Sequence, residues 1–140
     1  MCSRWWWLTC VALAACGEPV TKPDGGSVEV IHNCTEYVDR SAEGAARQVS
    51  FGSANDSPAL GYAPKCITIA RGQSVTFSGN FNTHPLSPGA FNADAGSPGN
   101  PITRKDTGAD DLVVVFPEAG LYPYYCDLHA PTMVGVVQVR

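Results

Sequence analysis

The most informative stretch of this 140-residue chain lies near its end and reads Tyr124-Tyr125-Cys126-Asp127-Leu128-His129-Ala130-Pro131-Thr132-Met133. The residues that lead into it alternate, so that Tyr122, Tyr124 and Cys126 lie on one face of a strand predicted at residues 121–126. A second strand is predicted at residues 134–139, where valines recur in phase. A thiol, an imidazole and a thioether therefore fall within eight positions, in a short loop between two strands.

A second imidazole lies upstream, at His84, just past a strand predicted at residues 74–78. Two imidazoles, a thiolate and a weak, distant thioether form the ligand set of a blue-copper electron-transfer site. The thiolate is soft and suits Cu(I), whereas imidazole suits both oxidation states, so one site serves both with little rearrangement. The residue types therefore predict a mononuclear copper site at four positions: His84, Cys126, His129 and Met133.

Each of these residues also has an ordinary structural interpretation. A cysteine at a strand end is commonly a small buried hydrophobe, and a methionine commonly fills a gap in the core. A single histidine is commonly a surface residue. The order His, Cys, His, Met on a framework of strands favours the metal site over these alternatives.

The rest of the chain predicts strands and turns. The 14 Gly and 11 Pro residues are typical of many turns and little helix. Residues 42–46 are the exception and predict one helical turn, and the polar residues 80–110 predict a long loop. Short β-type runs predict an all-β sandwich, and the seven runs are residues 27–31, 48–51, 67–69, 74–78, 112–116, 121–126 and 134–139.

Residues 62–140 resemble the cupredoxin family, nearest to its plastocyanin, pseudoazurin and amicyanin branch. The resemblance rests on Ile67-Thr68-Ile69, Gly72-Gln73-Ser74-Val75-Thr76-Phe77, His84, Gly120-Leu121-Tyr122, Tyr125-Cys126, His129, Met133 and Gly135. It implies a cupredoxin-like Greek-key β-sandwich of about seven to eight strands that holds one type 1 copper ion. It also implies that His84, Cys126 and His129 are the equatorial ligands. Met133 would be the axial ligand of a one-electron carrier.

The sequence departs from the family pattern at two places. Three residues separate His129 from Met133, whereas the plastocyanin-like pattern has four and the amicyanin-like pattern has two. Pro85 follows His84 directly, where the family commonly has Asn, and proline has no N–H to donate to the copper-bound sulfur. The N–H of Leu128 is available instead, where several relatives carry proline. We expect one hydrogen bond to the sulfur to be lost and another gained, which tunes the reduction potential.

The N-terminal residues predict export. A short positive region precedes a mostly apolar run that is too short to span a bilayer comfortably, which is typical of a signal peptide over residues 1–15. The sequence Leu13-Ala14-Ala15-Cys16 resembles a bacterial lipobox, so Cys16 is predicted to carry lipid; a plain signal peptide cut nearby is the alternative. Residues 16–26 then form a tether and 27–140 the copper-binding domain. We expect an exported protein anchored to the bacterial cell membrane, on the outer membrane facing the periplasm where two membranes are present.

Beyond the predicted signal peptide, two cysteines and one histidine remain. In an oxidising compartment, Cys34 and Cys66, which flank 31 residues, are expected to form a disulfide; two free thiols are the alternative. The disulfide would leave Cys126 as the unpaired thiol that copper requires. No partner stands near His32 in the sequence, and we interpret it as a surface residue rather than as part of a second metal site.

Composition narrows the classes of function. A net charge of -4 disfavours a nucleic-acid-binding surface. Three histidines are too few for the second copper centre of an oxidase or a nitrite reductase, so no enzyme is expected. A periplasmic copper-binding or copper-delivery protein without an electron-transfer role is the alternative, and a metal-free binding sandwich is another. The electron carrier is expected to be a monomer that exchanges electrons with a redox protein such as a cytochrome or an oxidase.

Electron exchange is expected through the edge of His129. An apolar rim for docking is predicted from Pro85, Leu86, Ala130 and Pro131. An acidic bias that would steer a basic partner is predicted from Asp106, Asp110, Asp111, Glu118 and Asp127, with ordinary solvation of these side chains as the alternative.

Overall fold

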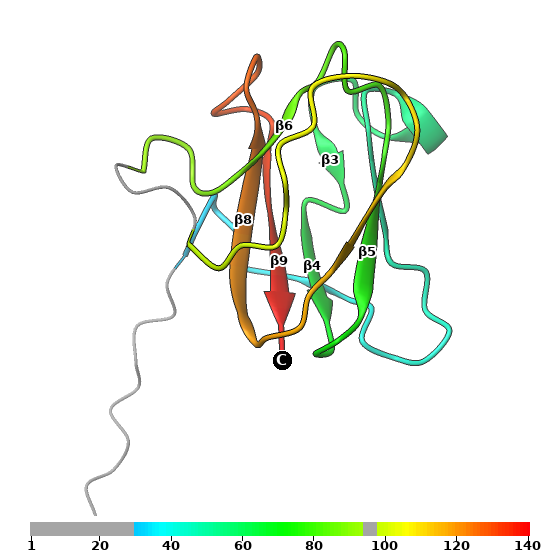
Figure 1. The fold of residues 1–140 in the computed structure, drawn as a ribbon, viewed down its shortest axis with the longest axis vertical. Helices are drawn as coiled ribbons and strands as arrows, with labels where there is room; N and C mark the ends of the chain where they lie inside the picture. The colour runs from blue at the N-terminus through cyan, green and yellow to red at the C-terminus, as the bar shows by residue number, and fades with distance from the viewer. Residues whose placement is uncertain (1–29, 94–97) are drawn as a thin grey trace, which may run out of the picture.

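Two sheets pack face to face in this computed structural model, which describes residues 30–93 and 98–140 (Figure 1). The first sheet has the strand order β1-β4-β9-β8-β6. Its strands are β1 Val38–Asp39, β4 Cys66–Ile69, β9 Val134–Val139, β8 Gly120–Cys126 and β6 Leu86–Pro88. The second sheet has the order β3-β2-β5-β7, with β3 Tyr62–Ala63, β2 Gln48–Phe51, β5 Ser74–Ser78 and β7 Leu112–Val115. The predicted cupredoxin-like β-sandwich is confirmed.

Both sheets are mixed. In the first, β4 is parallel to β1 and to β9, whereas β8 is antiparallel to β6 and to β9. In the second, β2 is parallel to β5 and antiparallel to β3, and β5 is antiparallel to β7. Parallel neighbours cannot be joined by a tight hairpin, so segments far apart in the chain are brought side by side.

The core lies between the two sheets. Alternation decides which side chains enter it: in β5 only Val75 and Phe77 are buried, and in β8 Tyr122, Tyr124 and Cys126 are buried. The aromatic rings meet edge to face, with Phe77 and Tyr124 at 5.1 Å between centroids. This packing fixes β8 against the second sheet and thereby sets the position of its last residue, Cys126.

A smaller cluster covers the outer face of the five-stranded sheet. The strand β4 is buried along its whole length because its second face is covered as well. Cys34 and Cys66 form a disulfide with 5.8 Å between their Cα atoms, and both pack against Val136. The sequence separation is 32, and a bridge that closes such a loop stabilises a fold by about 3–4 kcal/mol in the chain-entropy view.

Several expectations from the sequence are corrected here. The segment 80–110 is not one long loop, because it contains the strand β6, which pairs with β8. Leu86 also forms an isolated antiparallel bridge with Lys105 within the segment. The expected helical turn at 42–46 is a single hydrogen-bonded turn, from the Ala45 N–H to the Ala42 carbonyl, and no helix. The short strands β1 and β3 were not predicted, since two residues give no periodic signal.

The N-terminal expectations fall mostly on residues that the structure does not describe. The predicted signal peptide over 1–15, the lipidated Cys16 and the tether to residue 26 lie outside the described residues. The strand predicted at 27–31 lies partly outside them, and its last two residues, Val30 and Ile31, are not in a strand. Within the described residues, no helix is long and apolar enough to cross a membrane.

Candidate metal centre

Hydrogen bonds between neighbouring strands bring the four predicted ligand positions to one end of the sandwich, opposite the C-terminus (Figure 1). Cys126 is the last residue of β8, and its N–H donates to the Met133 carbonyl at 2.9 Å. The Met133 N–H in turn donates to the His129 carbonyl at 3.0 Å. His84 enters from the other edge, directly before β6, where the Asp127 N–H donates to the Pro85 carbonyl at 3.1 Å. The turn between β8 and β9 is thus closed on itself and fastened to the His84 segment.

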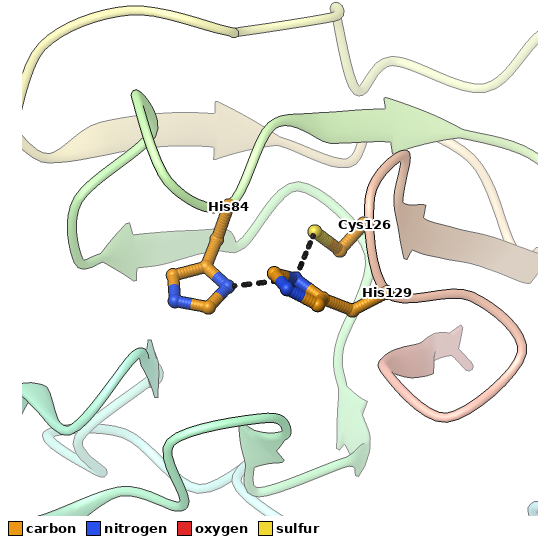
Figure 2. A group of neighbouring side chains, drawn as sticks. All are labelled: His84, Cys126 and His129. Atoms are coloured by element: carbon orange, nitrogen blue, oxygen red, sulfur yellow. Dashed lines mark hydrogen bonds between the residues drawn. The ribbon is translucent and has the colours of Figure 1, made fainter.

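Three of the four side chains converge (Figure 2). His84 Nδ1 lies 3.2 Å from His129 Nδ1, and His129 Nδ1 lies 3.4 Å from Cys126 Sγ. One ligand atom from each of the three lies within 4.8 Å of the others. Among the described residues, this is the one group of three or more His, Cys, Asp or Glu side chains close enough to hold a metal ion. His32, considered above for a second site, is not part of it.

The His84 ring is held in place by a glycine. A Cβ atom on Gly52 would lie 2.7 Å from His84 Cδ2 and 3.0 Å from Nε2, so no side chain fits at this position. Phe51 borders the same ring edge-on, with centroids 6.2 Å apart. The Nε2 edge therefore rests against the end of β2, which leaves Nδ1 to face His129 and Cys126.

Burial shifts the titration of two of these groups. Burial lowers the pKa of His84, and the nearby His129 imidazole lowers it further. Burial raises the pKa of the Cys126 thiol, while the backbone N–H groups of Leu128 and His129 beside the sulfur oppose that shift. The expectation that a Leu128 N–H acts on this sulfur agrees with that effect. The site therefore presents a neutral His84 imidazole to a sulfur that needs nearby positive charge in order to ionise.

The donor atoms fit a copper ion better than they fit one another. The Nδ1 atoms of His84 and His129 face each other, and a hydrogen bond between them uses only one proton. A nitrogen lone pair and the Cys126 sulfur then point into the space between the three side chains. Nitrogen and thiolate donors of this kind are those that copper prefers. Met133 is fully buried and belongs to the main core cluster. Its role as axial ligand remains a prediction.

The predicted docking features are partly wrong. Pro85 and Leu86 are buried and do not form an apolar rim, because this segment packs into the core beside the end of β8. Leu128, which the predicted rim did not include, is 64% exposed and stands next to His129. A leucine in a short turn between two predicted ligands has few side chains to pack against, so the sequence could have predicted that Leu128 is exposed.

Three of the predicted steering acids are engaged in ion pairs. Arg104 contacts both Asp106 and Asp127, and Arg71 contacts Glu118. The Arg104–Asp127 pair, at 2.8 Å, also ties the long 98–110 segment to the turn between β8 and β9. Exposed pairs of this kind contribute little to stability, but they cancel the local negative charge. Of the five predicted steering acids, only Asp110 and Asp111 are not in these ion pairs, and both are exposed.

Comparisons with known proteins agree with the fold and the site. Residues 47–140 match the copper-binding proteins of the plastocyanin/azurin family. The chloroplast plastocyanin of Physcomitrium patens is 34% identical over 94 residues, which are 60% of this chain and 53% of that protein. The chain therefore spans about half the length of the curated relative that it matches.

Two solved structures with a similar chain trace are a purple cupredoxin and an amicyanin. The purple cupredoxin, from Nitrosopumilus maritimus, is 26% identical, with a TM-score of 0.44, and the match covers 66% of this chain and 98% of that one. The amicyanin, from Paracoccus versutus, is 23% identical, with a TM-score of 0.44 and coverage of 71% and 85%.

The β-sandwich and the His-Cys-His group at its end define a cupredoxin, and copper is the cofactor of such a site. The family match covers most of the chain. The chain belongs to the plastocyanin/azurin family of copper-binding proteins.

The contact between Gly52 and His84 leads to a first prediction. Gly52→Ala places a methyl group against the imidazole ring at a backbone φ of +63°. We expect about 1–2 kcal/mol lower stability from the strained backbone and tenfold or weaker Cu(II) binding from the displaced ring. Calorimetric titration with Cu(II) and denaturant unfolding measure the two effects.

The matched control is Gly44→Ala. Gly44 has a φ of +75°, but an added Cβ atom would meet nothing within 4 Å, so it carries the backbone strain without the contact. This variant should lose stability and keep its Cu(II) affinity. Equal Cu(II) affinities in the two variants would show that Gly52 does not position His84.

Proposed function

We propose that this protein is a type 1 copper electron carrier of the bacterial cell envelope. The observation that supports it best is the convergence of His84 Nδ1, His129 Nδ1 and Cys126 Sγ within 4.8 Å, on segments whose backbone hydrogen bonds already fix all three. Copper bound there would supply a centre that gains and loses a single electron.

The contribution of the chain is rigidity. Cys126 and Met133 are fully buried, and His84 is 9% exposed, so water has little access to these three side chains. The backbone bonds from Cys126 to Met133 and from Asp127 to Pro85 hold the ligand turn in one geometry. A ligand set that is already positioned does not need to rearrange when the charge of its ion changes, and this favours fast electron exchange over slow metal delivery.

The surface route for electrons is the exposed side of the ligand turn. His129 is half-buried, whereas Leu128 and Pro131 on either side of it are exposed. These two exposed apolar residues flank His129 in the turn between β8 and β9. A redox protein with an apolar patch would fit this surface, and basic residues on it would be attracted by the exposed Asp110 and Asp111.

The copper site gives a direct prediction. The full chain titrated with one equivalent of Cu(II) should develop an intense visible thiolate-to-copper absorption band and a type 1 EPR spectrum. Cys126→Ser removes the sulfur that gives the band, so it should lose the colour while keeping the fold. Cys34→Ser with Cys66→Ser is the control, because these sulfurs form a disulfide on the outer face of the sheet. A colourless wild-type protein at one equivalent would contradict the proposed function.

Pro85 leads to a prediction for the potential. Pro85→Ala restores an N–H next to His84, and an N–H that bonds the sulfur withdraws charge from it and stabilises the reduced state. We expect the reduction potential to rise by on the order of 20–60 mV, since one hydrogen bond is worth about 1 kcal/mol and a tenfold change is about 59 mV for one electron. Voltammetry measures this shift. A potential that stays unchanged within error would count against the role of Pro85.

We propose further that lipid on Cys16 anchors the protein to the membrane. The support is the sequence Leu13-Ala14-Ala15-Cys16 and a disulfide that suits an oxidising compartment. In a bacterial host fed radiolabelled palmitate, the full chain should incorporate label and sediment with membranes. Cys16→Ser should do neither. Label that persists in this variant would place the lipid elsewhere or refute the anchor.

A further inference from the structure

The His32 imidazole, far from the metal centre in sequence, joins three segments of the chain. Its Nδ1 lies 3.0 Å from the Gly135 carbonyl oxygen on β9. Its Nε2 lies 3.0 Å from the backbone nitrogen of Phe91, in the segment that follows β6. The ring is half-buried and is not the surface residue that the sequence predicted.

The two partners determine which ring nitrogen carries the proton. A carbonyl oxygen only accepts, so Nδ1 must carry a hydrogen and donate it to Gly135. A backbone N–H only donates, so Nε2 must present a lone pair to Phe91. Both bonds exist together only for the neutral imidazole with its hydrogen on Nδ1.

The residues around His32 are held in a conformation that local preference does not favour. His32 and Asn33 have φ values of 54° and 59°, in the left-handed region that costs non-glycine residues of order 1 kcal/mol or more. The next residue, Cys34, is fixed to β4 by the disulfide. The segment is therefore fastened firmly at Cys34 and, two residues earlier, by the two hydrogen bonds of the His32 ring.

Phe91, one of the two partners of His32, also contacts β8, the strand that ends at Cys126. The Phe91 ring packs edge-on against Tyr125, with centroids 5.7 Å apart. Tyr125 directly precedes Cys126 in β8 and lies on the outer face of the sheet. Phe91 is thus a cover over this face, and His32 is one of the groups that hold it there.

We propose that His32 is a proton-operated clasp: the neutral ring holds Phe91 over Tyr125, and one proton taken from solvent at Nε2 breaks the bond from the Phe91 N–H and releases the cover. The protonated ring keeps its bond to Gly135, because Nδ1 still donates. Residues 32–34 stay attached through that bond and the disulfide, so the opening is local.

The surroundings of the ring favour the neutral form. Burial lowers the pKa of His32, the Gly135 carbonyl acts in the opposite direction, and the positive charge of Lys65 lowers the pKa again. Other titratable side chains on the neighbouring elements are Glu36 and Tyr37 in residues 30–37 and Tyr122, Tyr124, Tyr125 and Cys126 on β8. The charge that acts on the His32 ring is that of Lys65. The strand β9 brings no titratable side chain.

The direction of the pH effect follows from the lowered pKa of His32. The open form titrates near 6.5, the ordinary value, and the closed form titrates below it. The clasp is fully effective above pH 6.5. Its closing equilibrium falls about tenfold for each pH unit between 6.5 and the pKa of the closed form, because the open state binds the proton more tightly.

The test uses the isotope-labelled, metal-free full chain, so its outcome does not depend on copper binding. A long-range proton–nitrogen NMR spectrum should show His32 as the Nδ1–H tautomer with a pKa below 6.5. The hydrogen-exchange protection of the Phe91 amide should fall about tenfold per pH unit from pH 6.5 down to the pKa of the closed form. The Gly72 amide, bonded to the Phe116 carbonyl at 2.8 Å in the turn between β4 and β5, is the internal control and should keep its protection.

Two variants complete the test. In His32→Gln, the amide nitrogen can donate to Gly135 and the amide oxygen can accept from Phe91, so the clasp should stay closed and the pH dependence at Phe91 should disappear. In His32→Ala, the Phe91 amide should exchange rapidly at every pH. An Nε2–H tautomer, a His32 pKa at or above 6.5, or a Phe91 titration that persists in His32→Gln would overturn the proposal.

Discussion

Backbone pairing of β8 with a neighbour on each side places every predicted ligand of the metal centre. On one side β9 returns antiparallel, and the Cys126 N–H donates to the Met133 carbonyl. On the other side β6 pairs with the end of β8, and the Asp127 N–H donates to the Pro85 carbonyl next to His84. Three segments that are up to about fifty residues apart in the chain are thereby fixed at the same end of one sheet.

This pairing explains how unfavourable neighbours can be held together. Burial penalises the charged forms of these side chains, as the lowered pKa of His84 and the raised pKa of Cys126 show. The core provides the compensation, because Tyr124 and Phe77 anchor β8 on the opposite sheet. The bare ring edge of His84 fits only because residue 52 has no side chain. Such sites are stabilised by the surrounding fold rather than by their own contacts.

Some structural features of this protein belong to residues outside the part that matches the family. The match begins at residue 47, whereas His32 and Cys34 belong to the segment before it. Within it, residues 31–37 cover the outer face of the five-stranded sheet and add a disulfide and a hydrogen-bonded histidine to the sandwich. The same sheet therefore carries the metal centre at one end and a separate, titratable contact on one face.

Local patterns in the sequence were enough to predict the strands with clear alternation and the three side chains of the His-Cys-His group. Val75 and Phe77 are buried in phase because the period of a strand is two, and the same holds for Tyr122 and Tyr124. The folded chain alone reveals that Gly52 supports His84, that Arg104 neutralises Asp127 and that His32 reaches Gly135. These contacts join residues that are distant in the chain, and no local pattern encodes a contact whose distance is set by how two sheets pack.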